Sequence, residues 1–153
     1  MRDALSFVVD ASVGIKLALN EELTDRAQAL FSHLDADPPA RLHVPDLFYI
    51  ECANSLWKRV TRWNLPMTEA EQGITLIGGF PLYRVSTADL APDALKIAAE
   101  NGITAYDACY VALSRELGVP LVTADQKLLR RLAQSAFEIR WLGDVEVAPF
   151  LAT

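Results

Sequence analysis

The segment ITAYDACYVALSRELGVPLVTADQKL, residues 103–128, decides the fold class. It predicts a helix, a short loop, the apolar strand VPLVTA at 119–124, and a turn into a second helix. The absence of a hairpin signal favours a parallel sheet with helices packed on its faces. Asp107 lies in the first turn of the first helix and Asp125 follows the strand. The two acids are explained either as helix caps or as parts of one site.

The preceding sequence continues the alternation of strands and helices. LSFVVD, at 5–10, is an apolar run ending in Asp10, as expected of a strand buried on both faces. Helices are predicted over 11–22 and 24–37, the second with Thr24 as its N-cap, and a brief strand over 42–44. PDLFYIECANSLWKRVTRWN, at 45–64, predicts a long helix. Its apolar face is expected to comprise Tyr49, Ala53, Leu56, Trp57 and Val60.

The rest of the chain predicts four further elements. A helix begins at 68 and ends near Gly78, and PLYRVS at 81–86 is a strand. A helix over 91–101 is closed by Gly102, and FEIRWLG at 137–143 is the last strand. We therefore expect a single α/β domain over residues 1–153, with a largely parallel sheet.

Composition excludes several classes of protein. The chain has 153 residues, 52% of them hydrophobic and 22% charged, which is typical of a compact globular protein. It contains no run of about 18 apolar residues, so no transmembrane helix is expected. The start, MRDALSFVVD, carries acids and does not resemble a signal peptide. These features predict a cytoplasmic protein.

Cysteine and histidine are too scarce for a zinc site. The two cysteines, Cys52 and Cys109, form no CxxC pair, and there are two histidines. We interpret both cysteines as small, reduced core residues. Any metal is therefore expected to be a hard cation bound by oxygen.

The net charge of −6 argues against nonspecific coating of duplex nucleic acid. Basic residues still form two local clusters, Lys58/Arg59/Arg62 and Lys127/Arg130/Arg131. Each is explained either as a solvated helix face or as a contact to RNA.

Functional sites of parallel sheets form at the carboxyl ends of the strands, and four acids could converge there if the strands are neighbours. They are Asp10, Glu51, Asp107 and Asp125. Three of them lie where the chain leaves a strand or enters a helix, and the fourth, Glu51, lies one and a half turns into the helix after the second strand. Each also has a purely structural explanation: Asp10, Asp107 and Asp125 as helix caps, and Glu51 as an exposed helix residue. Thr104 and Asp107, for example, have the spacing of a capping box. Spacing alone does not choose between the two explanations.

The combination of four short motifs resembles the PIN-domain ribonucleases, and within them the VapC-type toxins of prokaryotic toxin–antitoxin pairs. The motifs are VVDASV, IECANSLWK, TAYDACYVAL and LVTAD, in the family's order and spacing over residues 7 to 142. The resemblance implies a three-layer sandwich in which helices flank a five-stranded parallel sheet. It also implies hydrolysis of RNA phosphodiesters with Mg²⁺ or Mn²⁺.

The chemistry of the residues agrees with this resemblance. Four carboxylates in one pocket repel one another, and divalent cations offset that repulsion. We expect Asp10, Asp107 and Asp125 to bind metal directly or through water. Glu51 is expected to hold a second metal or to orient the attacking water. Ser12, Asn54 and Thr123 are expected to support these carboxylates with hydrogen bonds.

Other residues near the motifs have simpler explanations. Thr104 is expected to be a helix cap, and Lys16 a solvated lysine rather than a contact to the RNA backbone. Tyr106 and Tyr110 are expected to pack, with base stacking as the alternative.

Rival families fit less well. A receiver domain needs an acid pair after the first strand and a lysine at the end of the last, and a haloacid-dehalogenase-like enzyme needs an acid where Ser12 stands. A housekeeping RNA-processing nuclease and a PIN scaffold that binds a partner without cutting remain open. The resemblance further implies a VapB-like antitoxin as partner and a homodimer. Independently of the resemblance, we expect residues 61–67 or Gly78 and Gly79 to contribute to the dimer.

Overall fold

Five parallel strands form the central sheet of the computed structural model, which describes residues 3–152. Met1, Arg2 and Thr153 of the predicted domain lie outside the described residues. The strands are β1 (Ser6–Val9), β2 (Arg41–Pro45), β3 (Tyr83–Val85), β4 (Leu121–Thr123) and β5 (Ile139–Trp141). The helices are α1 (Ala11–Ala18), α2 (Thr24–Ser32), α3 (Leu47–Trp63), α4 (Met67–Gly78), α5 (Thr87–Asn101), α6 (Ala105–Leu117) and α7 (Gln126–Arg131). The short 3₁₀ turns are η1 (His33–Asp35) and η2 (Leu142–Asp144). The predicted fold class is confirmed.

The strand order β3-β2-β1-β4-β5 places a topological switch point between β1 and β4. From β1 the chain proceeds to β2 on one side, whereas β4 pairs with the other side of β1. Ligands of open parallel sheets bind in the crevice at such a point, beyond the carboxyl ends of the strands. Asp10 and Asp125 follow β1 and β4, so both acids stand at this crevice.

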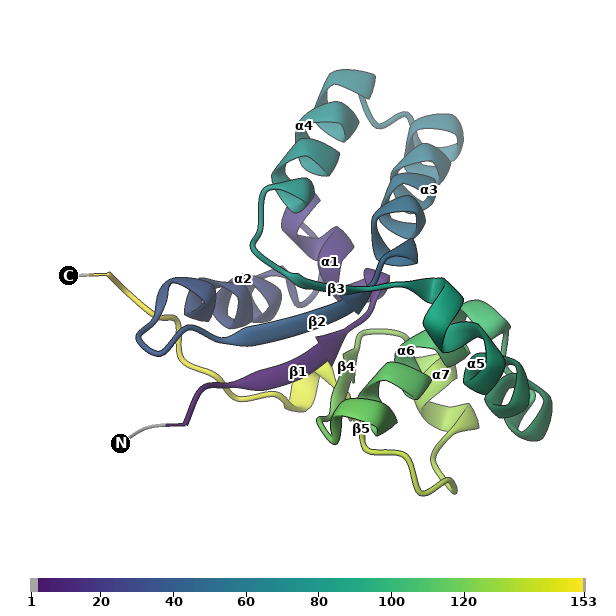
Figure 1. Ribbon diagram of the computed structural model, residues 1–153. Helices are drawn as coiled ribbons and strands as arrows, with labels where there is room; N and C mark the ends of the chain where they lie inside the picture. Colours follow the sequence, from purple (N-terminus) through teal and green to yellow (C-terminus); the bar gives the residue numbers. More distant parts are fainter. Residues whose placement is uncertain (1–2, 153) are drawn as a thin grey trace.

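Helices cover the sheet in two groups (Figure 1). α5, α6 and α7 lie together on one side of the sheet. On the other, α3 and α4 form a hairpin that projects from the sheet, and α1 packs against both of these helices. The central strands are buried accordingly, with Val8, Val9, Leu121 and Val122 completely inaccessible to solvent. Burial on both faces explains why β1 reads as a continuous apolar run.

Gly14 allows α1 to approach α3 very closely. A Cβ atom built at Gly14 would lie 2.5 Å from Phe48 Cζ and 3.2 Å from Cys52 Sγ. Phe48 is completely buried, so its ring has no free space into which to move. Glycine at this position therefore sets the separation between the helix that follows Asp10 and the helix that carries Glu51.

The predicted apolar face of α3 is right only in part, and the predicted N-cap of α2 is wrong. The buried residues of α3 are Phe48, Cys52 and Leu56, and only Leu56 belongs to the predicted face. Tyr49 and Val60 of that face are partly buried against the core. Trp57 is 55% exposed, because the predicted face borders a shallow groove against α4 rather than the core. Thr24 is not an N-cap: Leu23 occupies that position in a left-handed conformation, and the Thr24 hydroxyl donates to the carbonyl of Leu19.

Candidate active site

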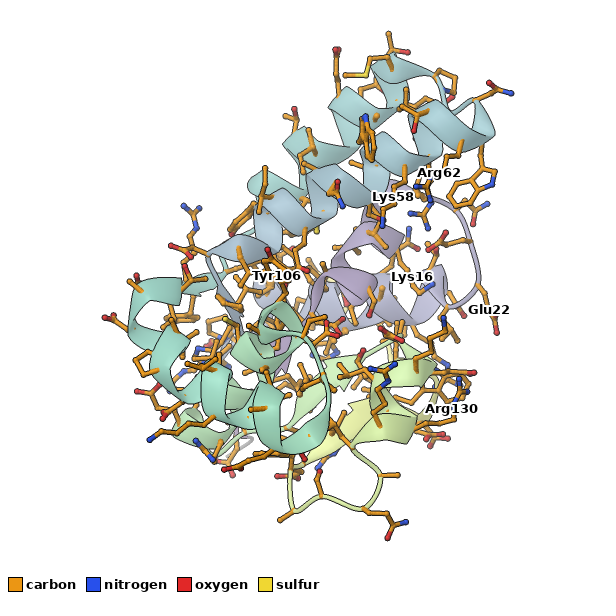
Figure 2. The ribbon with its side chains drawn as sticks, turned by 90° about the vertical axis from the view of Figure 1, so that its right-hand side faces the viewer. Lys16, Glu22, Lys58, Arg62, Tyr106 and Arg130 are labelled. Atoms are coloured by element: carbon orange, nitrogen blue, oxygen red, sulfur yellow. The ribbon has the colours of Figure 1, made fainter. Side chains whose placement is uncertain are left out.

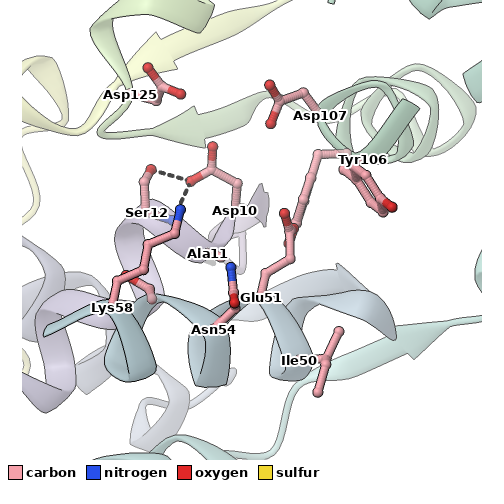
Figure 3. A pocket seen from close by; sticks show the side chains of 12 residues that line it. Asp10, Ala11, Ser12, Ile50, Glu51, Asn54, Lys58, Tyr106, Asp107 and Asp125 are labelled. Atoms are coloured by element: carbon pink, nitrogen blue, oxygen red, sulfur yellow. Dashed lines mark hydrogen bonds between the residues drawn. The ribbon is translucent and has the colours of Figure 1, made fainter. Parts of the chain in front are cut away.

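A single open pocket of about 670 Å³ gathers the four predicted acids. Asp10, Glu51, Asp107 and Asp125 reach it from the ends of β1 and β4 and from α3 and α6 (Figure 3). Asn54 and Lys58 lie on the same stripe of α3 as Glu51, as the spacing predicts, and both line the pocket. Residues distant in sequence thus form one carboxylate-rich cavity at the switch point.

Asp10 is the most deeply placed of the acids, with 5% of its surface exposed. One carboxylate oxygen accepts hydrogen bonds from the Ser12 backbone N–H and hydroxyl, and the other accepts from Thr123 Oγ1 at 2.6 Å. Burial raises the pKa of Asp10 to about 7, aided by the charges of Asp107 and Asp125 and opposed by the two hydroxyl donors. The predicted supporting positions of Ser12 and Thr123 are thus matched by direct hydrogen bonds.

Glu51 is held by a residue whose role the sequence interpretation missed. The Tyr110 hydroxyl donates to Glu51 Oε1 at 2.6 Å. Burial raises the pKa of Glu51, the hydrogen bond from Tyr110 lowers it, and the charge of Asp107 raises it. The signal was present, since Tyr110 lies three residues after Asp107 and therefore on the same side of the predicted helix.

Asp107 and Asp125 differ in how their side chains are used. Thr104 caps α6 by accepting from the Asp107 backbone N–H at 3.1 Å, as predicted. Burial and the charge of Asp125 raise the pKa of Asp107, whereas the Thr104 hydrogen bond and Arg131 lower it. Asp125 itself caps α7, accepting from the backbone N–H groups of Lys127 and Leu128. Asp125 therefore caps a helix and lines the pocket at the same time.

The remaining candidates have distinct positions. Asn54 is exposed in the pocket wall, and no hydrogen bond joins its side chain to an acid among residues 3–152. Cys52 and Cys109 are buried free thiols, as predicted. Tyr110 is buried, but Tyr106 is 67% exposed at the pocket rim, so the expectation of packing is wrong for Tyr106. Lys16 is not a solvated lysine, because its side chain is largely covered and pairs with Glu21.

Oxygen donors in this pocket suit a hard divalent cation. Within residues 3–152, no three acidic, histidine or cysteine side chains come close enough to enclose a metal ion by themselves. Asp10, Glu51, Asp107 and Asp125 would hold such a cation directly or through water. Burial, together with the charges of neighbouring acids, raises the pKa of Asp10 and Asp107, and a bound cation would offset both the lost solvation and the repulsion.

Comparison with known proteins gives the family. The PIN domain model matches residues 7–134. The chain belongs to the PIN-domain family. Ribonuclease VapC3 of Pyrobaculum aerophilum is 35% identical over 129 residues, which cover 83% of this chain and 95% of that protein. The VapC ribonuclease Mb0985 of Mycobacterium bovis is 32% identical over 121 residues, covering 79% of this PIN-domain chain and 87% of the relative.

Solved structures agree with the PIN fold. A crystal structure from Pyrobaculum aerophilum superposes with a TM-score of 0.62 at 25% identity, covering 84% of this chain and 87% of that one. A toxin–antitoxin complex from Klebsiella pneumoniae gives a TM-score of 0.62 at 11% identity, covering 91% of this chain and 99% of that one. The second likeness concerns the fold alone.

Proposed function

We propose that this PIN-domain protein is a metal-dependent endoribonuclease that acts as the toxin of a toxin–antitoxin pair. The observation that carries the proposal is the convergence of Asp10, Glu51, Asp107 and Asp125 on one pocket. RNA as the substrate is supported by the relatives named ribonuclease, because most of the length of each relative aligns with this chain.

The roles of the side chains follow from their contacts. Bound Mg²⁺ or Mn²⁺ would supply a water of lowered pKa and offset the charge of the phosphate. Ser12 and Thr123 stabilise the ionised form of Asp10, the form able to bind a cation. Tyr110 holds Glu51 Oε1, leaving the other oxygen free to orient the attacking water. Asp107 and Asp125 complete the carboxylate set.

The test is cleavage of labelled single-stranded RNA by the purified protein. We expect cleavage with Mg²⁺ or Mn²⁺ and its loss in EDTA, because uncompensated carboxylates repel the phosphate. A circularised RNA should also be cut, since an endonuclease requires no free end. Sustained cleavage in EDTA would overturn the metal mechanism, and a wild type inactive with both metals would favour the non-catalytic PIN scaffold.

The partner is proposed to be a VapB-like antitoxin. Among the structures with the same fold, one is a toxin–antitoxin complex from Klebsiella pneumoniae. Charge complementarity favours a partner arginine in the acidic pocket. Expression of the chain alone should arrest growth, and co-expression with the product of a short reading frame immediately upstream should restore it. Harmless expression combined with RNA cleavage in vitro would instead indicate a housekeeping nuclease.

Two further expectations accompany this proposal. Cytoplasmic action agrees with an RNA substrate and stays a prediction. No helix within residues 3–152 combines the length and apolar character needed to cross a membrane. The homodimer also stays a prediction; Trp63 and Met67, in the segment expected to contribute to it, are 67% and 59% exposed.

A further inference from the structure

A second groove, of about 620 Å³, adjoins the acidic pocket at Asp125. Its walls include three cationic side chains, one further acid and an indole ring. They are Lys16, Glu22, Lys127, Arg130 and Trp141. We call it the Lys127–Arg130 groove. Because Asp125 lines both cavities, the groove continues the active-site cleft rather than forming a separate depression.

The structure divides the two basic clusters of the sequence into engaged and free cations. Arg59 is engaged: its guanidinium pairs with Glu21 at 3.0 Å and donates to Ser55 Oγ at 2.6 Å. Arg131 is engaged as well, donating to the carbonyl of Gly102 at 2.8 Å. Lys127 and Arg130 are exposed, and within residues 3–152 neither side chain forms an ion pair or a hydrogen bond.

The groove has a fixed wall beside these free cations. Trp141, at the end of β5, packs closely on Gly143, where an added Cβ would lie 2.5 Å from the ring. Lys16 is also held in place, because its ammonium pairs with Glu21 at 3.2 Å. The exposed, unpaired charges of the groove are therefore those of α7, and they face a preformed surface that needs little ordering on binding.

The acidic pocket and the groove lie side by side on one face of the molecule (Figure 2). Tyr106 lies on one side of that face, and Lys16, Glu22 and Arg130 lie on the other. The acidic pocket includes Tyr106 and the Lys127–Arg130 groove includes Arg130, so the acids occupy the middle of a continuous path. A nucleic-acid strand that runs from Tyr106 across the four acids therefore enters the Lys127–Arg130 groove.

We infer that single-stranded RNA leaves the acidic pocket over Asp125 and lays its flanking phosphates on Lys127 and Arg130 in this groove. The inference rests on the proposed nuclease function and adds which residues hold the substrate beside the cut. Unpaired cations next to repelling carboxylates attract phosphates locally, although the net charge of the protein is −6. Glu22 opposes this attraction from the same groove.

The test compares substitutions of opposite expected sign. In Lys127→Gln/Arg130→Gln, the KM for a long single-stranded RNA and its Kd in EDTA should rise at least about tenfold, with kcat preserved. The slope of log K against log salt should become shallower by about 1.4, since each phosphate contact on a single strand contributes about 0.7. Glu22→Gln should lower the KM and Kd, an effect that misfolding does not produce.

The matched control is Lys96→Gln/Arg41→Gln. It removes the same charge from exposed side chains outside both cavities, Arg41 being at the amino end of β2 and so at the opposite edge from the acids. It should leave the KM and salt slope nearly unchanged. If the wild type is active but the salt slopes of the two double variants are equal, the role of the groove is overturned and the nuclease function stands. The same holds if Glu22→Gln does not lower the KM and Kd. Wild type that cleaves no RNA with either metal would overturn the proposed function itself, and this inference with it.

Discussion

The Tyr110 hydroxyl and Glu51 Oε1, 2.6 Å apart, join α6 to α3 across the acidic pocket. Burial and the charge of Glu51 hold the pKa of Tyr110 far above its ordinary value. The phenol therefore stays protonated and acts as a donor to the carboxylate. Its partner Glu51 is thereby fixed in position and favoured in its ionised form.

Tyr110→Phe should weaken both functions of this contact. Loss of the donor should raise the pKa of Glu51 further, moving the ascending limb of the kcat/KM profile to higher pH. The free energy of unfolding should fall by about 1–3 kcal/mol, because the partly buried Glu51 carboxylate loses its hydrogen-bond donor. Tyr83→Phe, at an exposed position, is the control. An unshifted pH profile would mean that Tyr110 only packs.

Asp10 should make the metal-free protein less stable as pH rises. Its pKa in the folded protein is about 7 rather than 3.8, so the folded state binds a proton that the unfolded state has lost between these values. The contribution of Asp10 to the free energy of unfolding is therefore complete below pH 3.8 and declines between pH 3.8 and about 7, by up to about 1.4 kcal/mol per pH unit. Above about pH 7 the decline from Asp10 ends.

Denaturant melts in EDTA across this window provide the measurement. Asp10→Asn should remove the Asp10 component, so the stability difference between variant and wild type should grow in favour of the variant with rising pH. Adding Mg²⁺ should restore wild-type stability at the alkaline end only. A stability difference that does not vary with pH would contradict the raised pKa.

Asp107→Asn should separate stability from activity. Removing one charge relieves repulsion with Asp125, so melts in EDTA should show equal or higher stability. RNA cleavage with Mg²⁺ should fall at least about a hundredfold if the acid holds the metal. Asp125→Asn should behave alike, since asparagine caps helices as well as aspartate does. Lower melting temperatures with near-normal cleavage in both variants would identify the acids as caps only.

Gly14→Ala tests the close approach of α1 and α3. A methyl group 2.5 Å from Phe48 Cζ must displace a fully buried ring, at a cost of about 1–3 kcal/mol. Gly78→Ala is the matched control, because a Cβ there meets nothing within 4 Å. It should stabilise α4 by up to about 1 kcal/mol. Equal melting temperatures for the two variants would mean that the helices can separate without penalty.

Local patterns predicted the fold because each strand and most helix ends carry their own signal. The apolar run before Asp10 and the glycine at 102, which ends α5 at φ 66°, needed no tertiary information. The α3 surface was predicted only in part, because helical spacing identifies an apolar stripe but not the element that packs on it. Here the stripe containing Trp57 borders α4, and the core takes Phe48.

The acids were predicted, but their mutual geometry was not. That Asp125 caps α7 while lining the pocket, and that Tyr110 reaches Glu51, both depend on how helices are placed across the sheet. The two basic clusters illustrate the same limit. Arg130 and Arg131 are equivalent in sequence, yet α7 directs one to the groove and the other to the carbonyl of Gly102.

Asp10 and Asp125 both cap helices, and this decides which substitution suits a crystal structure with uncut RNA. Both side chains accept backbone hydrogen bonds at helix starts, Asp10 from Ser12 and Asp125 from Lys127. Alanine at either position would remove a cap together with a charge, whereas asparagine keeps an oxygen for the backbone and removes the charge alone. Asp125→Asn is therefore expected to be inactive while the mouth of the groove keeps its shape. It is the natural choice for trapping uncut RNA in a crystal.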